Sequence, residues 1–168
     1  YGPSKNDSTS VEKRKNTDVQ HLRLEGAAYG KISQTSRADM RLYYYRSERG
    51  LPGATIFYNT DNASKQRLWD KTFFAQAHYR NDFSETWAIQ ANAKYNYGYQ
   101  HYLDPTYLNS AGKLENFYRQ HEGYGSVALL YNPYPALQVS AATDLTSATP
   151  DANLYNFVYP RRITLQSA

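Results

Sequence analysis

The stretch from Trp87 to Tyr97, WAIQANAKYNY, alternates between apolar and polar residues, and this alternation constrains the fold more than any other feature of the chain. Its odd-numbered positions carry Trp, Ile, Ala or Tyr, whereas the even-numbered positions from 90 onward carry Gln, Asn or Lys. Successive side chains of a β-strand point to opposite faces of a sheet, so this period predicts a strand with one apolar and one polar face. The apolar face would cover the core of a soluble sandwich or meet the hydrocarbon of a membrane.

Similar alternation marks seven candidate strands, and no segment has the pattern of an amphipathic helix. The strands are predicted at 19–30, 37–46, 68–80, 86–98, 123–132, 136–145 and 161–168. The longest apolar run extends only from Val127 to Tyr131, whereas a helix needs about 20 apolar residues to cross a bilayer. Any crossing of a membrane would therefore require a closed β-barrel.

The connections between these strands alternate between short and long. Short ones are expected at 31–36, 81–85 and 132–135, and long ones at 47–67, 99–122 and 146–160, after a polar stretch at 1–18. This rhythm is typical of outer-membrane barrels, which have tight periplasmic turns and long external loops. We therefore expect residues 1–168 to form part of one antiparallel up-and-down transmembrane β-barrel of about seven strands. A further strand at 54–58 would complete an eight-stranded barrel, and Greek-key sandwiches, which also mix connection lengths, leave a soluble fold open.

The rings near the ends of the alternating segments predict aromatic girdles at the borders of a membrane. With a hairpin centred on Phe83, Tyr79 would pair with Trp87. In the same register Trp69 would pair with Tyr97, with small residues between the two aromatic pairs. The ten residue steps from Trp87 to Tyr97 span about 33 Å, which a tilt near 45° projects to roughly 23 Å. The apolar band between girdles is about 25 Å tall, so a lipid-facing wall fits these segments better than a sandwich core.

The composition excludes some classes of partner and site but does not identify the function. The chain has 18 Tyr, whose apolar ring and polar tip suit surfaces where lipid or ligand meets water. The net charge of +4 arises from Lys and Arg scattered among 15 acidic residues, so no nucleic-acid partner is indicated. The absence of Cys excludes disulfides and thiolate metal sites. Residues 1–16 lack the apolar core and cleavage site of a signal peptide, so we expect a leader already removed or an internal segment.

No motif of an enzyme or of a metal site is found. The four histidines are isolated in the sequence and are expected to be solvated or to face a lumen: His21, His78, His101 and His121. Glu115 and Glu122 could act as paired carboxylates, but every domain contains such pairs. The segment Asn59 to Asn62 is expected to form an ordinary turn rather than a calcium site. We expect no enzymatic activity, no metal and no cofactor.

Aromatic residues in the long loops are the candidate substrate-binding residues, namely Tyr58, Tyr99, Tyr102, Tyr107, Phe117, Tyr118 and Tyr155. Exposed rings give rigid contact area and stack on sugars or on other flat ligands. The alternative is that these rings pack the loops against one another or extend the outer girdle. Both interpretations assume that the seven rings lie outside the strands.

Two segments carry a family resemblance: RLYYYRSERGLPGATIFYN at 41–59 and KQRLWDKTFFAQAHYRNDF at 65–83. They resemble the barrel of TonB-dependent outer-membrane receptors, particularly the Bacteroidetes type, in which an E-R-G-L-P-G-like loop precedes a strand that opens with R-L-x-D. The matching residues are Glu48, Arg49, Gly50, Leu51, Pro52 and Gly53, followed by Arg67, Leu68 and Asp70. Independently of the family, glycines on either side of Leu51 and Pro52 predict a compact turn.

The resemblance implies a barrel of about 22 strands with a plug in its lumen, located in the cell outer membrane. Such a receptor imports a scarce nutrient, such as cobalamin, an iron chelate or a glycan, when TonB pulls on the plug. The implied partners are outer-membrane lipid, the remaining barrel and plug, TonB, and a surface lipoprotein. No plug-like or TonB-contacting segment is found near the start, and the sequence ends at Ala168 without a terminal aromatic residue, so we expect roughly a third of such a barrel. The alternatives are a secreted β-sandwich that binds carbohydrate and a small barrel used for adhesion.

Overall fold

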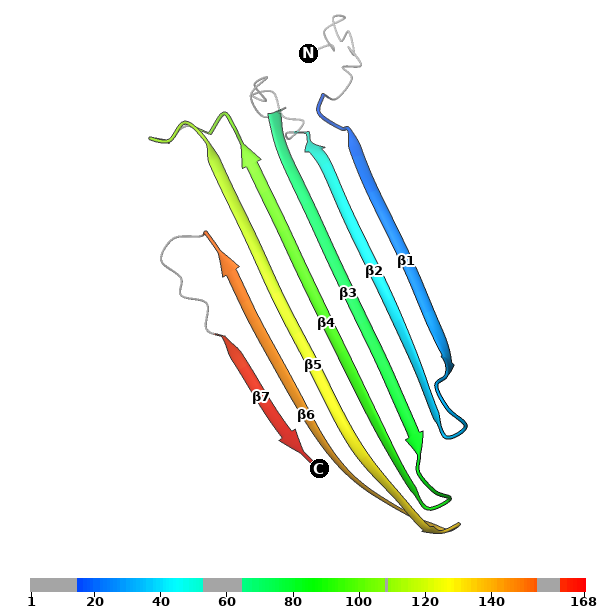
Figure 1. The fold of residues 1–168 in the computed structure, drawn as a ribbon. Helices are drawn as coiled ribbons and strands as arrows, with labels where there is room; N and C mark the ends of the chain where they lie inside the picture. The colour runs from blue at the N-terminus through cyan, green and yellow to red at the C-terminus, as the bar shows by residue number, and fades with distance from the viewer. Residues whose placement is uncertain (1–14, 53–64, 108, 154–160) are drawn as a thin grey trace, which may run out of the picture.

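The computed structural model describes residues 15–52, 65–107, 109–153 and 161–168, which form one antiparallel sheet (Figure 1). Its strands are β1 (Val19–Lys31), β2 (Ser36–Leu51), β3 (Gln66–Asp82), β4 (Trp87–Asp104), β5 (Leu114–Tyr134), β6 (Leu137–Ala152) and β7 (Arg162–Ser167). Each strand pairs with the next in sequence, so the topology is up-and-down. The all-β, seven-stranded prediction is confirmed, while the additional strand considered at 54–58 lies outside the described residues.

Most strands run further than the alternation of residues indicated. The segments predicted as long loops at 47–67, 99–122 and 146–160 begin or end inside β2 to β6, because β4 continues to Asp104 and β5 begins at Leu114. Backbone hydrogen bonds maintain the ladder through these extensions although both faces there carry polar side chains. The alternation that identified the strands is absent where both faces are polar. β5 has 21 residues, against the usual strand length of about 3–10.

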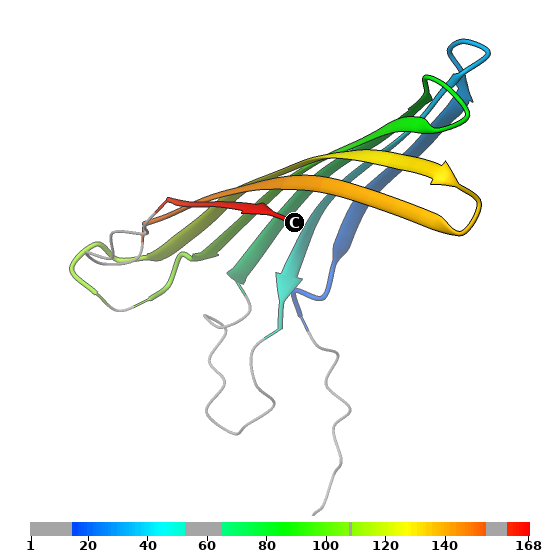
Figure 2. The ribbon, with the colours of Figure 1, turned by 90° about the horizontal axis from the view of Figure 1, so that it is seen from below.

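The described sheet is open, with β1 and β7 as its two edges. The three short turns lie together at one end, and the strand ends that lead to the longer connections lie at the other (Figure 1). The sheet is strongly twisted, so that β6 (orange) runs across the direction of β1 (blue) in Figure 2. The twist accumulates across the seven strands because each strand is rotated relative to its neighbour in the same direction.

The register of the β3–β4 hairpin differs from the predicted one. Tyr79 pairs with Ala91 instead of Trp87, a shift of four residues. The turn is centred beyond Phe83, because the hydroxyl oxygen of Ser84 accepts hydrogen bonds from the backbone N–H of Thr86 at 3.2 Å and of Trp87 at 3.1 Å. Side chains alternate between faces with a period of two, so an even shift leaves every residue on its predicted face.

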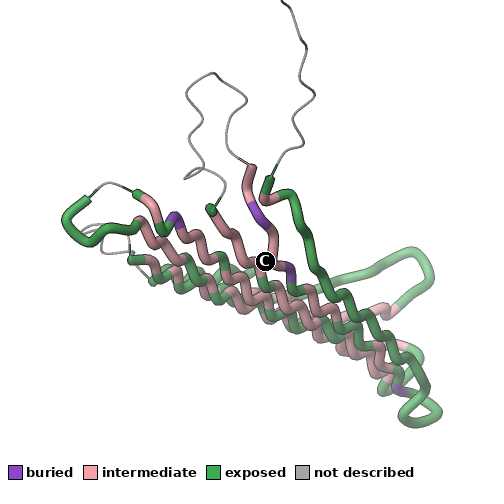
Figure 3. The backbone as a smooth tube through the Cα atoms, turned by 90° about the horizontal axis from the view of Figure 1, so that it is seen from above, coloured by how far each residue is buried: buried purple, intermediate pink, exposed green. Residues whose placement is uncertain are grey.

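This register gives the sheet two chemically different faces. The even-numbered residues of β1 and β2 and the odd-numbered residues of β3 to β7 share the face that we call the apolar face, and the remaining residues form the polar face. In β5 this rule holds up to Tyr131, beyond which the register shifts and Tyr134 pairs with Leu137. Among the described residues, Ala88, at 3% exposure, is the one buried apolar residue. Figure 3 shows how few positions of the described sheet are buried. The described strands therefore have no hydrophobic core, and the apolar face lacks a cover within this part of the chain.

Candidate functional site

The part of the apolar face nearest the short turns carries no charged side chain. Its upper limit is the row of paired residues Leu24, Tyr44, Phe73, Tyr97, His121 and Thr149. Its middle row crosses all seven strands and consists of Ala28, Met40, Ala77, Ala93, Gly125, Leu145 and Leu165. We call the region from the upper row to the short turns the apolar band; in its described residues every Asp, Glu, Lys and Arg side chain belongs to the opposite face.

The middle of the apolar band is hollowed. A shallow open depression of about 780 Å³ extends along the middle row from Ala28 on β1 to Leu165 on β7. Its floor is formed by small residues such as Ala77, Ala93 and Gly125, which leave the backbone close to the surface. Larger side chains, including Tyr79 and Leu145, also line it. The band thus offers a broad, open apolar surface instead of an enclosed pocket.

Aromatic rings border the apolar band at both ends. Near the short turns, Trp87 stacks on Tyr131 with ring centroids 4.2 Å apart. At the upper limit the Tyr97 ring lies 4.9 Å from that of His121, whose Nδ1 is 2.8 Å from the hydroxyl of Tyr95. Both borders of the band therefore carry rings with a polar tip or edge.

The four predicted girdle residues all lie on the apolar face, but they do not pair as expected. Tyr97 pairs with Phe73, and Trp69 lies four residues further along β3, stacked on His101 at 4.8 Å. Tyr79 lies within the band rather than opposite Trp87. The even shift of register explains both differences, since it moves each partner along its strand without changing its face.

A row of polar side chains lies directly behind the middle of the apolar band. It consists of Tyr29, Asp39, His78, Asn92, Ser126, Asp144 and Gln166 on the polar face. The amide oxygen of Asn92 lies 2.7 Å from Nδ1 of His78, and the amide nitrogen of Asn92 donates to the hydroxyl of Ser126 at 3.0 Å. The hydrogen-bonded polar row and the charge-free apolar row occupy the same stretch of sheet on opposite sides.

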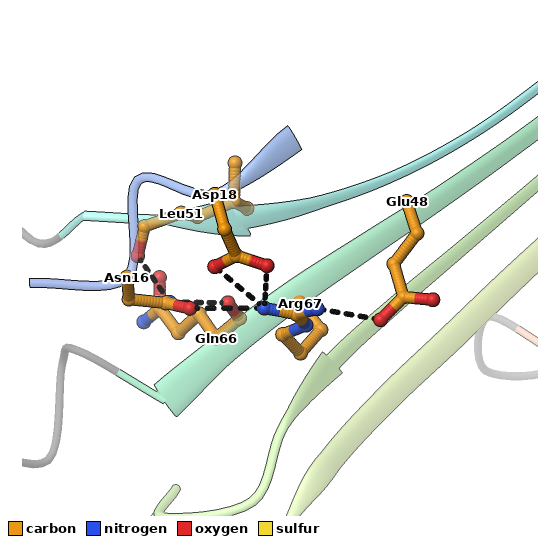
Figure 4. Close-up of polar contacts among 6 residues, drawn as sticks. All are labelled: Asn16, Asp18, Glu48, Leu51, Gln66 and Arg67. Carbon is orange, nitrogen blue, oxygen red and sulfur yellow. Dashed lines mark hydrogen bonds and ion pairs between the residues drawn. The ribbon is translucent and has the colours of Figure 1, made fainter. Parts of the chain in front are cut away.

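The motif residues that carry the family resemblance lie at the far end of the sheet, beyond the apolar band. Figure 4 shows the polar contacts of Arg67 and Asn16 at this end. Arg67 donates through Nη1 to both carboxylate oxygens of Asp18, at 2.9 and 2.8 Å, and through Nη2 to Glu48 at 2.5 Å. The bond from Arg67 is the main cause that lowers the pKa of Glu48 below its ordinary value. The side-chain amide of Asn16 donates to the backbone oxygens of Leu51 and Gln66 at 3.1 and 2.6 Å. These contacts attach the segment before β1 to the ends of β2 and β3.

Gly50 has a different role from the predicted one. It lies in β2, paired with Arg67, and not in a compact turn; Gly53, the second glycine of that prediction, lies outside the described residues. A Cβ atom at Gly50 would lie 2.5 Å from the backbone oxygen of Asn16 and closer still to its side chain. The Gly50 N–H also donates to the backbone oxygen of Asp18 at 2.9 Å. Glycine is required here because another chain segment passes directly over it, and Asn16 adopts a positive φ of 58° to do so.

Arg49 and Asp70 of the motif lie on the polar face. Asp70 forms an ion pair with Arg49 at 3.1 Å and accepts hydrogen bonds from Ser47 at 3.3 Å and from Gln100 at 3.0 Å. These contacts connect β2, β3 and β4 through one carboxylate. The motif residues for which the structure shows contacts therefore stabilise the end of the sheet, and none of them lines the depression in the apolar band.

The predicted substrate-binding aromatics do not form one surface. Four of them lie in strands, where Tyr99 and Phe117 belong to the apolar face and Tyr102 and Tyr118 to the polar face. Tyr107 follows β4 and is 47% exposed. The two others, Tyr58 and Tyr155, lie outside the described residues. The assignment of these rings to loops was wrong for the first four because β4 and β5 extend beyond the alternating segments.

The structure also places the titratable residues that the sequence singled out. Glu115 and Glu122, which were considered as a carboxylate pair and not adopted, lie on opposite faces of β5. His101 does not stand alone in solvent; its Nε2 lies 2.9 Å from Glu115, and a bond from Lys113 to the same carboxylate lowers the pKa of Glu115, with His101 adding to the effect. His121 lies among the rings of the upper border. The described residues contain no group of three His, Cys, Asp or Glu placed to hold a metal ion.

The contacts of Gly50 and Arg67 predict a pH dependence. The pKa of Glu48 is lowered in the folded protein, so its ion pair contributes stability above the ordinary carboxyl range and loses it as the pH falls through the lowered pKa. The Gly50 amide donates to the backbone oxygen of Asp18, whose carboxylate binds Arg67, the partner of Glu48. We expect this amide to lose protection from hydrogen exchange below about pH 4, after correction for the intrinsic exchange rate. The control is the Asn132 amide, which donates to the backbone oxygen of Thr86, a residue without a carboxylate. Equal behaviour of the two amides would contradict the role of Glu48.

No protein-family model matches the sequence, and no curated protein matches it. The described residues include no helix that is long and apolar enough to span a bilayer. The sequence pattern missed the hydrogen-bonded polar row and the crossing of Asn16 over Gly50. The one sequence signal for the crossing is the residue type at position 16, because Asn adopts a positive φ more readily than most residues.

Proposed function

We propose that this chain is a wall segment of an outer-membrane β-barrel in which the apolar band faces lipid and the polar face lines a water-filled lumen. The observation that carries this proposal is the charge-free band across seven strands with the polar row directly behind it. In a bilayer the outer face must exclude charge over a height of about 25 Å, whereas the lumen of such a barrel is polar.

The extent of the apolar band supports lipid rather than a second protein sheet as its cover. The band stops at the row of Tyr44 and Phe73, and the strands continue beyond it with charged residues on both faces, such as Glu48 and Arg49. Two packed sheets keep their inner faces apolar along the length that they share. A bilayer ends at a defined height, and strands that protrude beyond it meet water on both sides. Strands with one polar face inside the band and two polar faces beyond it are therefore expected of a barrel wall that protrudes from the membrane.

The open edges and the arrangement of the turns also support a barrel. Strands tilted by about 45° place turns of equal depth at stepped positions along the sheet. The register has this stagger. β3 ends at Asp82, beyond Asn81, which pairs with the first residue of β2, Ser36. β5 ends at Tyr134, three residues beyond Tyr131, which pairs with the first residue of β4, Trp87. Further strands would pair with β1 and β7 and complete the wall.

Within this class we propose a TonB-dependent receptor that takes up a scarce nutrient, such as cobalamin, an iron chelate or a glycan. Support comes from the resemblance of residues 41–59 and 65–83 and from strands that extend far beyond the band on the side of the long connections. Energy would come from TonB acting on a plug, and the outer membrane would be the location. The full-length gene product is expected to bind the periplasmic domain of TonB in a pull-down; a lipid-embedded barrel that does not bind it would contradict the receptor assignment alone.

Site-directed labelling tests which solvent each face meets. Single cysteines can be introduced at Ala93 on the apolar face and at Ala128 on the polar face of the full-length gene product. Residues 1–168 contain no Cys, and any Cys elsewhere in the gene product is first replaced by Ser. We expect an environment-sensitive dye at position 93 to be quenched by brominated lipid, and the same dye at position 128 to be quenched by aqueous iodide. Quenching by iodide at both positions would contradict the wall assignment. A dye at position 93 that neither quencher reaches would instead favour the secreted sandwich.

A further inference from the structure

A row of cations crosses the apolar face immediately beyond the apolar band. Arg46 on β2 pairs with Lys71 on β3, Lys71 pairs with Tyr99 on β4, and Tyr99 pairs with Arg119 on β5. Each of these residues lies two positions along its strand from the upper aromatic row of the band. We call Arg46, Lys71 and Arg119 the cationic row.

The cationic row is exposed and lacks anionic partners. All three side chains are exposed, and none forms an ion pair with a described residue. Asp151, which pairs with Arg119 in the register and shares its face, does not form an ion pair with it. Cations further from the band do have anionic partners, since Arg67 binds Asp18 and Glu48. On the described part of the apolar face, the cations without an ion pair therefore lie where the apolar surface ends.

The ring of Tyr99 orders part of this row. Nζ of Lys71 lies 5.5 Å from the centroid of the Tyr99 ring, and the guanidinium carbon of Arg119 lies 5.9 Å from the same centroid. The Phe117 ring also contacts Arg119, at 5.2 Å. Cation–π contacts hold a charge near a ring without neutralising it, so both cations keep their capacity to bind an anion.

We propose that the cationic row binds the phosphate groups of outer-leaflet lipids, in particular a phosphorylated glycolipid of the lipopolysaccharide type. The inference rests on the proposed function, because it takes the apolar band as the surface that contacts acyl chains. The cationic row lies two residues beyond the upper aromatic row, which on a tilted strand is a rise of roughly 5 Å. Aromatic rings lie at the membrane–water interface, so this rise places the cationic row at the depth of the lipid headgroups. Arg and Lys bind phosphate through short, charge-assisted hydrogen bonds, and the charge of the row complements such a headgroup.

A matched pair of double variants tests the proposal. Lys71→Gln with Arg119→Gln removes two charges of the cationic row, and Arg41→Gln with Lys94→Gln removes two exposed, unpaired charges of the polar face. In the detergent-solubilised full-length gene product, we expect the first variant to bind bisphosphorylated lipid A about thirtyfold more weakly and the second to bind it like the parent protein. Binding of dephosphorylated lipid A is expected to be the same in all three proteins.

Three results would overturn the inference: equal weakening by both variants, weakening that persists with dephosphorylated lipid A, or displacement of lipid A by millimolar inorganic phosphate, which would indicate a site for a soluble anion. The dye at position 93 separates this inference from the proposed function. Quenching of that dye by brominated lipid, together with unchanged lipid A binding by the Lys71 and Arg119 variant, would contradict the cationic row alone. A dye that brominated lipid does not quench would contradict the wall assignment itself.

Discussion

Ala91→Arg in the full-length gene product is expected to destabilise the protein folded in lipid vesicles by about 2–4 kcal/mol, measured as a lower free energy of unfolding. Ala91 lies inside the apolar band, between Tyr79 and Val127 on the neighbouring strands. An Arg at this depth would bring a charge into hydrocarbon or force its side chain to stretch toward the headgroups. Reversible unfolding in urea, followed by Trp fluorescence, measures the difference.

Ala128→Arg is the matched control because it makes the same substitution at similar depth on the polar face. Ala128 pairs with Gln90 and Ala142, so an Arg there would face the lumen without a like charge directly opposite. We expect its effect on stability to be close to zero, and equal destabilisation by Ala91→Arg and Ala128→Arg would contradict the assigned faces. Asn92→Arg, which the alternation alone predicts to be harmless, should cost about 1 kcal/mol, because Asn92 is bonded to both His78 and Ser126.

Gly50→Val is expected to detach the segment from Asn16 to Asp18. The new side chain would overlap the backbone of Asn16, and relief of that overlap would break the bonds of Asn16 to Leu51 and Gln66. Overpacking of this kind costs about 1–3 kcal/mol. Because 2 kcal/mol corresponds to roughly a thirtyfold change in an opening equilibrium, we expect tryptic cleavage after Lys15 to accelerate by about that factor.

Gly98→Val provides the comparison for this variant. A Cβ at Gly98 meets no atom within 4 Å, although Gly98 also lies in a strand. We expect cleavage after Lys15 to be unchanged in Gly98→Val. A similar acceleration in both variants would attribute the effect to the loss of glycine in a strand rather than to the crossing of Asn16.

The alternation in the sequence was sufficient to place the strands and to assign their faces. From Trp87 to Tyr97 each residue lies on the face that its position predicts, even though the predicted hairpin register was displaced by four residues. Face assignment tolerates such an error because it depends only on odd or even position. The pairing of individual residues does not tolerate it, so the expected pairs of Tyr79 with Trp87 and of Trp69 with Tyr97 were wrong.

The outer parts of the strands were not predictable in the same way. Between Tyr99 and Asp104 polar and aromatic residues occur on both faces of β4, so hydrophobicity does not distinguish a strand from a loop there. What extends the strand is pairing of its backbone with β3 and β5, an interaction that every sequence can make. For the same reason Tyr99 and Phe117 were assigned to loops, and the cationic row around Tyr99 was not recognised.

The sequence by itself determined the class of structure: antiparallel strands with one apolar and one polar face, because the period of two is a local property of the backbone. Tertiary structure alone decided which rings stack, which cations remain unpaired, and why position 50 is glycine. Asn16 lies 35 residues before Leu51, to which it donates a hydrogen bond, and no local pattern encodes a contact across that separation. Contacts of this kind depend on the register and twist of the whole sheet, which are set by all seven strands together.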